Sequence, residues 1–223
     1  MPDQKFELYA ESVTIVGGAG FSTVDLDECL VHCPILIAAD GGANDLINEK
    51  YQPEYIIGDL DSLKDRKSWE TGLTKVIQIE EQESTDFEKC LYSVQARNYL
   101  CVGFVGGRSD HFLSACTSLV KYNCKCIILV GPNDVIFHVP KIFEIDLPVK
   151  TRLSLFPMQE ITGIEDVGLR WPISGIKFDP ATRVGTSNIT TERTVKLILS
   201  NEGMLMMLPR SCLRIVIKKF QKL

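Results

Sequence analysis

Up to about Val139 the chain repeats one pattern: a short apolar run, a loop with glycine or an acid, and a stretch with helical spacing. The apolar runs are nearly continuous, which is typical of strands buried on both faces of a parallel sheet. The repetition therefore predicts an α/β domain with helices on both faces of that sheet. The expected strands are residues 13–16, 35–39, 55–57, 75–79, 100–105 and 126–130.

Acidic side chains stand where several of these runs end. Asp40 follows 35–39, Asp59 and Asp61 follow 55–57 and Gly58, and Asp86 comes after 75–79. Ligands of parallel sheets bind at the carboxyl ends of the strands, so these acids should share one edge. Like charges held so close need a cation, and oxygen ligands without His or Cys suit Mg²⁺. The pattern predicts a site where Mg²⁺ holds a polyphosphate.

Plainer interpretations of the same residues stay open. Asp59 and Asp61 can form an acidic turn that faces water. Asp86 can simply begin a helix, because Thr85 and a glutamate three residues later match a capping box. Arg108 presents a fork of donors that suits phosphate oxygens, but it can also pair with Asp110 at the surface.

A glycine loop, Gly17-Gly18-Ala19-Gly20, follows the first expected strand. Such a loop can let phosphate approach backbone N–H groups. It lacks the full dinucleotide fingerprint and the P-loop lysine, so a turn without a ligand is the favoured interpretation. Ser22 or Thr23 should cap a helix that runs to about Leu30, and a further helix is expected from about Ala43 to Glu49.

After Lys141 the helical spacing disappears and apolar residues alternate with polar ones, as in 143–147 and 152–156. Two runs, 195–199 and 204–208, flank a turn sequence and predict a hairpin. Residues 213–217 are expected to form a last strand before a basic end. We therefore expect two domains, 1–140 of α/β type and 141–223 of antiparallel β type.

Composition narrows the possible partners. The chain of 223 residues has a net charge of −5, which argues against nucleic acid or an anionic membrane surface as the main partner. No apolar run approaches the roughly 20 residues that a membrane helix needs, and residues 1–12 do not resemble a secretory signal. The eight cysteines form no CxxC pair. We expect reduced thiols and a cytoplasmic protein.

Six blocks of the sequence, in order, resemble the thiamin pyrophosphokinase family. The blocks span about Ala38 to Asn188, and their order makes the resemblance specific. They are Asp40-Gly41-Gly42-Ala43-Asn44, Gly58-Asp59-Leu60-Asp61-Ser62, Ser84-Thr85-Asp86-Phe87-Glu88-Lys89-Cys90, Gly106-Gly107-Arg108-Ser109-Asp110-His111, Gly168-Leu169-Arg170-Trp171-Pro172-Ile173 and Gly185-Thr186-Ser187-Asn188.

This resemblance implies a Rossmann-like N-terminal domain, a C-terminal antiparallel β-sandwich and a homodimer. It implies the reaction ATP + thiamin → thiamin diphosphate + AMP with Mg²⁺. The residues that would hold the metal are Asp40, Asp59, Asp61 and Asp86. ATP contacts would come from Asp40, Gln82, Thr85, Asp86 and Arg108, and catalytic roles would fall to Asp61, Asp86, Arg108 and Asp110.

The resemblance also implies that Trp171, Ser187 and Asn188 contact thiamin across the dimer interface. An aromatic face suits a cationic thiazolium, although Trp171 can equally be a core residue and the other two a β-turn. One departure from the family is Glu81-Gln82-Glu83, where its members often have Asp-Gln-Asp. Two other functions stay open: a Mg²⁺-dependent pyrophosphokinase for another alcohol, and a non-catalytic thiamin or nucleotide sensor.

Overall fold

The computed structural model describes residues 7–46 and 50–221. The chain is mixed α/β: among these residues the largest sheet is mixed, and a separate sheet of four strands is antiparallel. Two compact units are present. Unit 1 comprises Met1–Ser118 with Leu129–Pro132, and unit 2 comprises Leu119–Ile128 with Asn133–Leu223.

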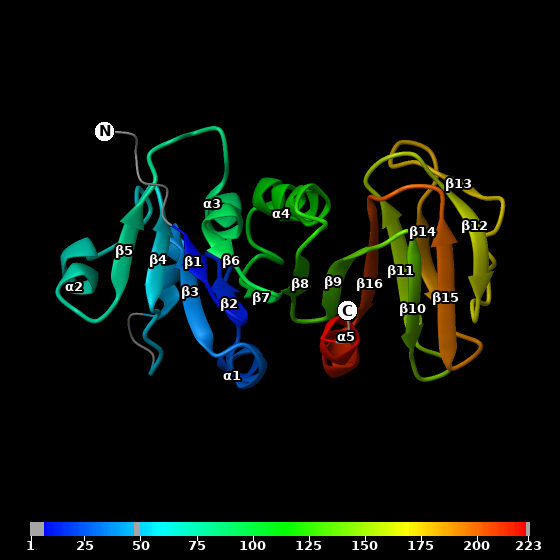
Figure 1. Cartoon of the computed structure of the whole chain (residues 1–223), viewed down its shortest axis with the longest axis horizontal. Coiled ribbons are helices and arrows are strands. Elements are labelled where there is room, and N and C mark those ends of the chain that lie inside the picture. The colour runs from blue at the N-terminus through cyan, green and yellow to red at the C-terminus, as the bar shows by residue number, and fades with distance from the viewer. Residues whose placement is uncertain (1–6, 47–49, 222–223) are drawn as a thin grey trace. The chain divides into compact units, whose positions relative to one another are not determined.

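Unit 1 contains parallel strands (Figure 1). Ile15, Ile37 and Ile56 are fully buried on three of them. These strands confirm the expected runs, except that the run expected at 100–105 is a strand over 98–102 that ends before Gly103, whose φ is 73°. The shared direction of the strands brings the loops after β3 and β4 to the same edge. Their order is β7 (Asn98–Val102), β2 (Ser12–Val16), β3 (Ile35–Ala39), β4 (Tyr55–Gly58) and β5 (Lys75–Gln78), and β8 (Cys126–Val130) is the sixth expected run.

The helices begin largely where the capping residues predict. The Ser22 side chain accepts the Asp25 N–H at the start of α1 (Thr23–His32). Thr85 and Glu88 form a reciprocal capping box at α3 (Asp86–Ser93), which satisfies two backbone donors there. The remaining elements of this part are α4 (Ser109–Lys121), a short α2 (Arg66–Glu70) that was not predicted, and the parallel pair β1 (Leu8–Tyr9) and β6 (Val94–Gln95).

The helix expected from Ala43 is a 3₁₀ helix instead, η1 (Asp40–Leu46). Its first residues include Gly41 and Gly42, which favour an α-helix poorly, and Asp40 has a positive φ of 39°. The tighter 3₁₀ turn suits such a short segment. The end of the expected helix, 47–49, lies outside the described residues.

Unit 2 contains antiparallel strands, as the alternating pattern predicts. In β10 every second side chain is buried. One run of neighbours is β14 (Gly185–Ile189), β11 (Arg152–Pro157), β16 (Met204–Pro209) and β9 (Asp134–Val139), and the other is β10 (Ile142–Asp146), β15 (Thr194–Leu199), β12 (Ile161–Val167) and β13 (Lys177–Phe178).

The expected hairpin between 195–199 and 204–208 is wrong. Both strands form, but β15 pairs with β10 and β12, whereas β16 pairs with β9 and β11. The turn between them therefore carries the chain from one sheet to the other. The burial patterns explain the choice: β15 buries alternate residues, while Met204, Leu205 and Met206 are all fully buried in β16, as a strand covered on both faces requires.

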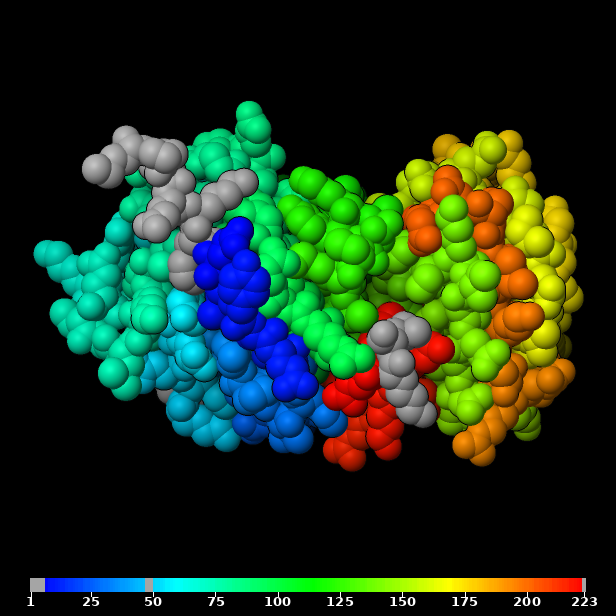
Figure 2. All heavy atoms as spheres, viewed as in Figure 1, coloured from blue at the N-terminus to red at the C-terminus, as the bar shows by residue number. Residues whose placement is uncertain are grey.

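The expected last strand at 213–217 is also wrong, because these residues open α5 (Leu213–Phe220) after the 3₁₀ turn η2 (Arg210–Cys212). Leu213, Val216, Ile217 and Phe220 are buried, and this i, i+3, i+4, i+7 spacing defines one helix face. Lys218 and Lys219 fall in the last turn, where the helix dipole favours cations. Atoms of α5, red in Figure 2, reach the surface on the face shown.

His138 on β9 gives unit 2 a pH-dependent stability. Its Nε2 accepts the Gly203 N–H at 3.1 Å, and burial lowers the pKa of its imidazole despite the nearby Glu202 carboxylate. The unfolded chain then takes up this proton at a higher pH than the folded one, so stability should fall as the pH drops below about 6.5.

We expect His138→Gln to remove part of this loss. Urea midpoints measured between about pH 7 and pH 5 should decline less steeply for the variant than for the wild type. His32→Gln, at the end of α1, serves as the control. Equal slopes for His138→Gln and the wild type would contradict the assignment.

Candidate functional site

Three acids of unit 1 come together as the sequence predicts. Asp40, Asp59 and Asp61 each offer a carboxylate oxygen, and these oxygens all lie within 4.8 Å of one another. Asp40 directly follows β3, and the other two follow β4. The neighbouring parallel strands thus deliver carboxylates from separate loops to one edge of the sheet.

Asp40 is the most buried member of the cluster, with 2% of its surface exposed. Its Oδ2 accepts the Ser62 N–H at 3.1 Å, whereas its Oδ1 is buried without a hydrogen-bond partner. Burial, followed by the charge of Asp86, raises the pKa of this carboxyl. A buried oxygen without a donor, beside two other carboxylates, fits a hard cation such as Mg²⁺.

Asp59 and Asp61 meet through a turn rather than an extended segment. Leu60 between them has a φ of 68°, and the Asp61 N–H donates to Asp59 Oδ1 at 3.2 Å. Both carboxylates join the cluster through this turn. Burial would raise the pKa of Asp59, but hydrogen bonds from Gln82 and the Asp61 N–H, with the charge of Lys89, lower it.

The backbone around the cluster leaves little free space. An added Cβ on Gly58 would lie 2.6 Å from Asp40 Cβ and 3.0 Å from Asp86 Oδ1. Gly58 is the last residue of β4, so the strand end itself forms a wall of the site. The glycine before Asp59 thus serves close packing, a role that the sequence alone does not reveal.

Asp86 begins α3 and faces the same loop, because its Oδ1 accepts the Asp59 N–H at 3.3 Å. Gln82 donates to Asp59 Oδ2 at 3.0 Å, and Thr85 caps the helix. Sequence reasoning missed Lys89, whose Nζ lies 3.2 Å from Asp86 Oδ1 and 3.4 Å from Asp59 Oδ2. The signal available for it was the three-residue spacing from Asp86, which places both side chains on one helix face.

A pocket of about 320 Å³ adjoins the acids in unit 1. Its lining includes Asp40, Asp86, Thr85 and Arg108 together with the backbone of Gly17 and Gly18. The first glycine loop, for which a turn without a ligand was favoured, therefore forms part of the pocket wall. The exposed Arg108 is paired with Asp110, with Nη2 2.6 Å from Oδ2. The Arg108 hydrogen bond lowers the pKa of Asp110 to about 2.

The three residues expected to contact thiamin lie close together in unit 2. The Asn188 side chain accepts the Trp171 N–H at 3.2 Å and donates to the Trp171 carbonyl at 2.7 Å. The indole of Trp171 is half exposed, with the Arg170 guanidinium 4.9 Å from its ring centre. Ser187 has a φ of 62°, and its N–H donates to Ser154 Oγ. Asn188 therefore fixes the backbone that presents the indole.

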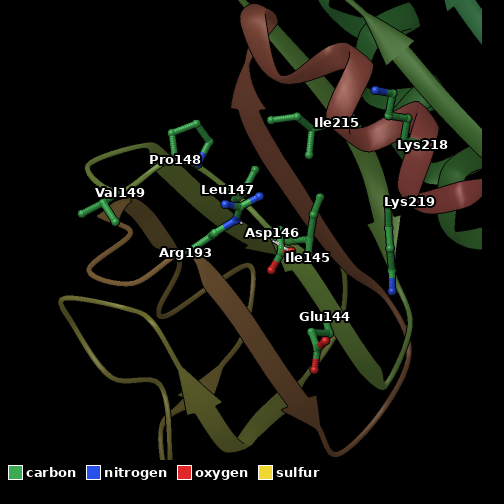
Figure 3. A pocket seen from close by; sticks show the side chains of 10 residues that line it. All are labelled: Glu144, Ile145, Asp146, Leu147, Pro148, Val149, Arg193, Ile215, Lys218 and Lys219. Carbon is green, nitrogen blue, oxygen red and sulfur yellow. Dashed lines mark ion pairs between the residues drawn. The ribbon is translucent and has the colours of Figure 1, made fainter.

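Unit 2 has a second pocket, of about 610 Å³, shown in Figure 3. Basic side chains from Arg193, Lys218 and Lys219 and acidic ones from Glu144 and Asp146 line it. None of the residues singled out from the sequence as site residues lies in this pocket. Arg193 Nε and Asp146 Oδ2 in this pocket form an ion pair with each other at 4.0 Å. The acid cluster of unit 1 remains the better candidate for chemistry.

Comparison with known proteins adds to this geometry. Residues 26–130 match the family described as "Thiamin pyrophosphokinase, catalytic domain", and this segment contains the whole acid cluster. The family model and the curated relatives both identify the thiamin pyrophosphokinase family. It is 27% identical to thiamine pyrophosphokinase 1 of Oryza sativa subsp. japonica, over 72% of this chain and 74% of that protein. It is 26% identical to thiamin pyrophosphokinase 1 of Caenorhabditis elegans, over 72% and 73%.

Solved structures of the family share the fold. The thiamin pyrophosphokinase from Candida albicans aligns with a TM-score of 0.78 and 20% identity, covering 94% of each chain. The yeast thiamin pyrophosphokinase aligns with a TM-score of 0.76 and 19% identity, over 100% of this chain and 90% of that one. At this level of identity the likeness shows the fold, and function depends on the residues of the site.

Proposed function

We propose that this chain transfers the diphosphoryl group of ATP to the hydroxyl of thiamin, giving thiamin diphosphate and AMP. The observation that carries the proposal is the buried, unpartnered Oδ1 of Asp40 inside a carboxylate cluster that lies wholly within the family segment. Asp40, Asp59, Asp61 and Asp86 are proposed to hold Mg²⁺, which would neutralise charge on the triphosphate oxygens.

The other side chains around the pocket are proposed to bind ATP and to accept the proton of the thiamin hydroxyl. Arg108 exchanges its contact with Asp110 for a phosphate oxygen, since its planar fork suits both partners. Gln82 and Thr85 orient ATP at the start of α3. Asp61 or Asp86 accepts the proton of the thiamin hydroxyl as its oxygen attacks the β-phosphorus and AMP leaves. Holding both reactants in line supplies a large share of the rate enhancement.

The finer organisation is part of the same proposal. A Rossmann-like domain over 1–140 carries the ATP and Mg²⁺ site, and an antiparallel β-sandwich over 141–223 carries thiamin contacts at Trp171, Ser187 and Asn188. Two copies form a homodimer with thiamin at their interface. A cytoplasmic location accords with the eight free cysteines of the chain. In the part of the chain that the structure describes, no helix is long and apolar enough to cross a membrane.

Product analysis tests the reaction. Purified protein with ATP, thiamin and Mg²⁺ should yield AMP and thiamin diphosphate in equal amounts by chromatography, and chelation of Mg²⁺ should stop both. ADP with thiamin monophosphate would identify a single phosphoryl transfer and overturn the proposal. Binding of thiamin and ATP without turnover would favour a sensor, and turnover only with another alcohol would favour a different pyrophosphokinase.

Trp171→Ala should raise KM for thiamin by about tenfold, because a cation–π contact contributes roughly 0.5–2 kcal/mol. The value of kcat should change less, since the indole is proposed to contact bound thiamin and not the reacting phosphates. Steady-state kinetics at saturating ATP would measure both parameters. Trp171→Phe keeps an aromatic face and should recover most of the affinity. An unchanged KM in the alanine variant would remove Trp171 from the thiamin site.

A further inference from the structure

Lys89 is a cation in an unusual place. Its side chain is 1% exposed, although a buried ammonium is stable only with close anionic partners. Asp59 and Asp86 supply them, with oxygens 3.4 Å and 3.2 Å from Nζ. An ammonium so enclosed does not reach a substrate in the pocket, so any part that it plays in the reaction passes through these two carboxylates.

Lys89 contacts one carboxylate oxygen of Asp59 and one of Asp86, and each of these oxygens also accepts a second hydrogen bond. Asp86 Oδ1 accepts from Lys89 and from the Asp59 N–H, and Asp59 Oδ2 accepts from Lys89 and Gln82. Both oxygens lie within 3.4 Å of one nitrogen and are therefore close to each other. Without a positive charge between them, the two carboxylates would repel and turn apart.

We propose that Lys89 is a positioning residue for the reaction: its ammonium holds Asp59 and Asp86 in the arrangement that receives the metal–triphosphate complex. This inference rests on the proposed function. Lys89 offsets one of the four negative charges that Asp40, Asp59, Asp61 and Asp86 bring together, so the acids stay assembled before any cation arrives. The cluster is then preorganised and needs no rearrangement when the complex binds.

Metal binding tests the inference apart from activity. Mn²⁺ binding would be measured by electron paramagnetic resonance, with Mn²⁺ alone and with α,β-methylene-ATP, which cannot be cleaved at the reacting bridge. Lys89→Met should bind Mn²⁺ about tenfold or more weakly than the wild type, because Asp59 and Asp86 lose their shared partner. Lys67→Met removes a positive charge from exposed α2 and should bind like the wild type.

Lys89→Gln keeps a donor without the charge and covers the case in which the methionine variant does not fold. It should also bind Mn²⁺ more weakly while giving a wild-type circular dichroism spectrum. A folded Lys89 variant that binds Mn²⁺ as tightly as the wild type, or more tightly, would overturn the inference: Lys89 would then be only structural, or would compete with the metal by charge. Absence of Mn²⁺ binding by the wild type would instead contradict the proposed metal site.

Discussion

Asp40→Asn should lower kcat by on the order of 10³-fold, while the metal-free protein stays folded and at least as stable as the wild type. The loss follows from removing one anionic metal ligand, since charge stabilisation by a bound metal is worth several kcal/mol and each ~1.4 kcal/mol is tenfold in rate. Burial and the charge of Asp86 raise the pKa of the Asp40 carboxyl, which means that its charged form destabilises the folded protein. The substitution should therefore not lower the stability. A neutral amide removes that unfavourable charge.

The measurement pairs AMP formation with thermal unfolding in the presence of a chelator. Asp45→Asn is the matched control, since Asp45 is an exposed acid in the same 3₁₀ helix. It should leave kcat and the melting temperature unchanged. Full activity in Asp40→Asn would remove Asp40 from the metal site, and a marked drop in the melting temperature would show that its charge serves the fold.

Gly58→Ala should reduce kcat/KM by about 10²-fold, a loss expected when catalytic groups move by about 1 Å. The added methyl would lie 2.6 Å from Asp40 Cβ and 3.0 Å from Asp86 Oδ1, so two members of the site must shift. Because Gly58 ends a buried strand, part of the strain will also appear as lost stability, typically about 1–3 kcal/mol for overpacking.

Kinetics and urea unfolding of the purified variant would separate the two effects. Gly72→Ala is the control, because a methyl there meets nothing nearer than Gln52 Nε2 at 3.4 Å, which is ordinary contact. The interpretation fails if Gly58→Ala retains wild-type kcat/KM, since the methyl group would then have been absorbed without moving the acids.

Much of the α/β half can be read from the sequence because its signals are local. Most strands of unit 1 are largely apolar runs, although β5 begins with Lys75 and ends with Gln78. Thr85 with Glu88 marks the start of α3. The gathering of Asp40, Asp59 and Asp61 follows from a simple rule about parallel sheets. For these residues the local sequence pattern is enough to predict which side chains lie close together.

The predictions that were wrong concern segments whose structure depends on packing against residues distant in the sequence. Residues 213–217 suit a strand or a helix by composition, and only burial of Val216 and Phe220 on one face settles the helix. The turn sequence before Gly203 predicts a hairpin, because turn residues alone do not indicate that β15 and β16 pair with different strands. The role of Lys89 was not predicted, because burial of a lysine depends on an anionic partner from another loop, here Asp59.

One stretch of five residues, Thr85 to Lys89, contributes to both the fold and the proposed chemistry. Thr85 and Glu88 secure the first turn of α3, and the same turn sets Asp86 and Lys89 against Asp59. Selection for stability and selection for activity therefore act on neighbouring codons of one helical turn. We expect compensating changes to be rare here, so this segment should diverge more slowly than the surrounding helix surface.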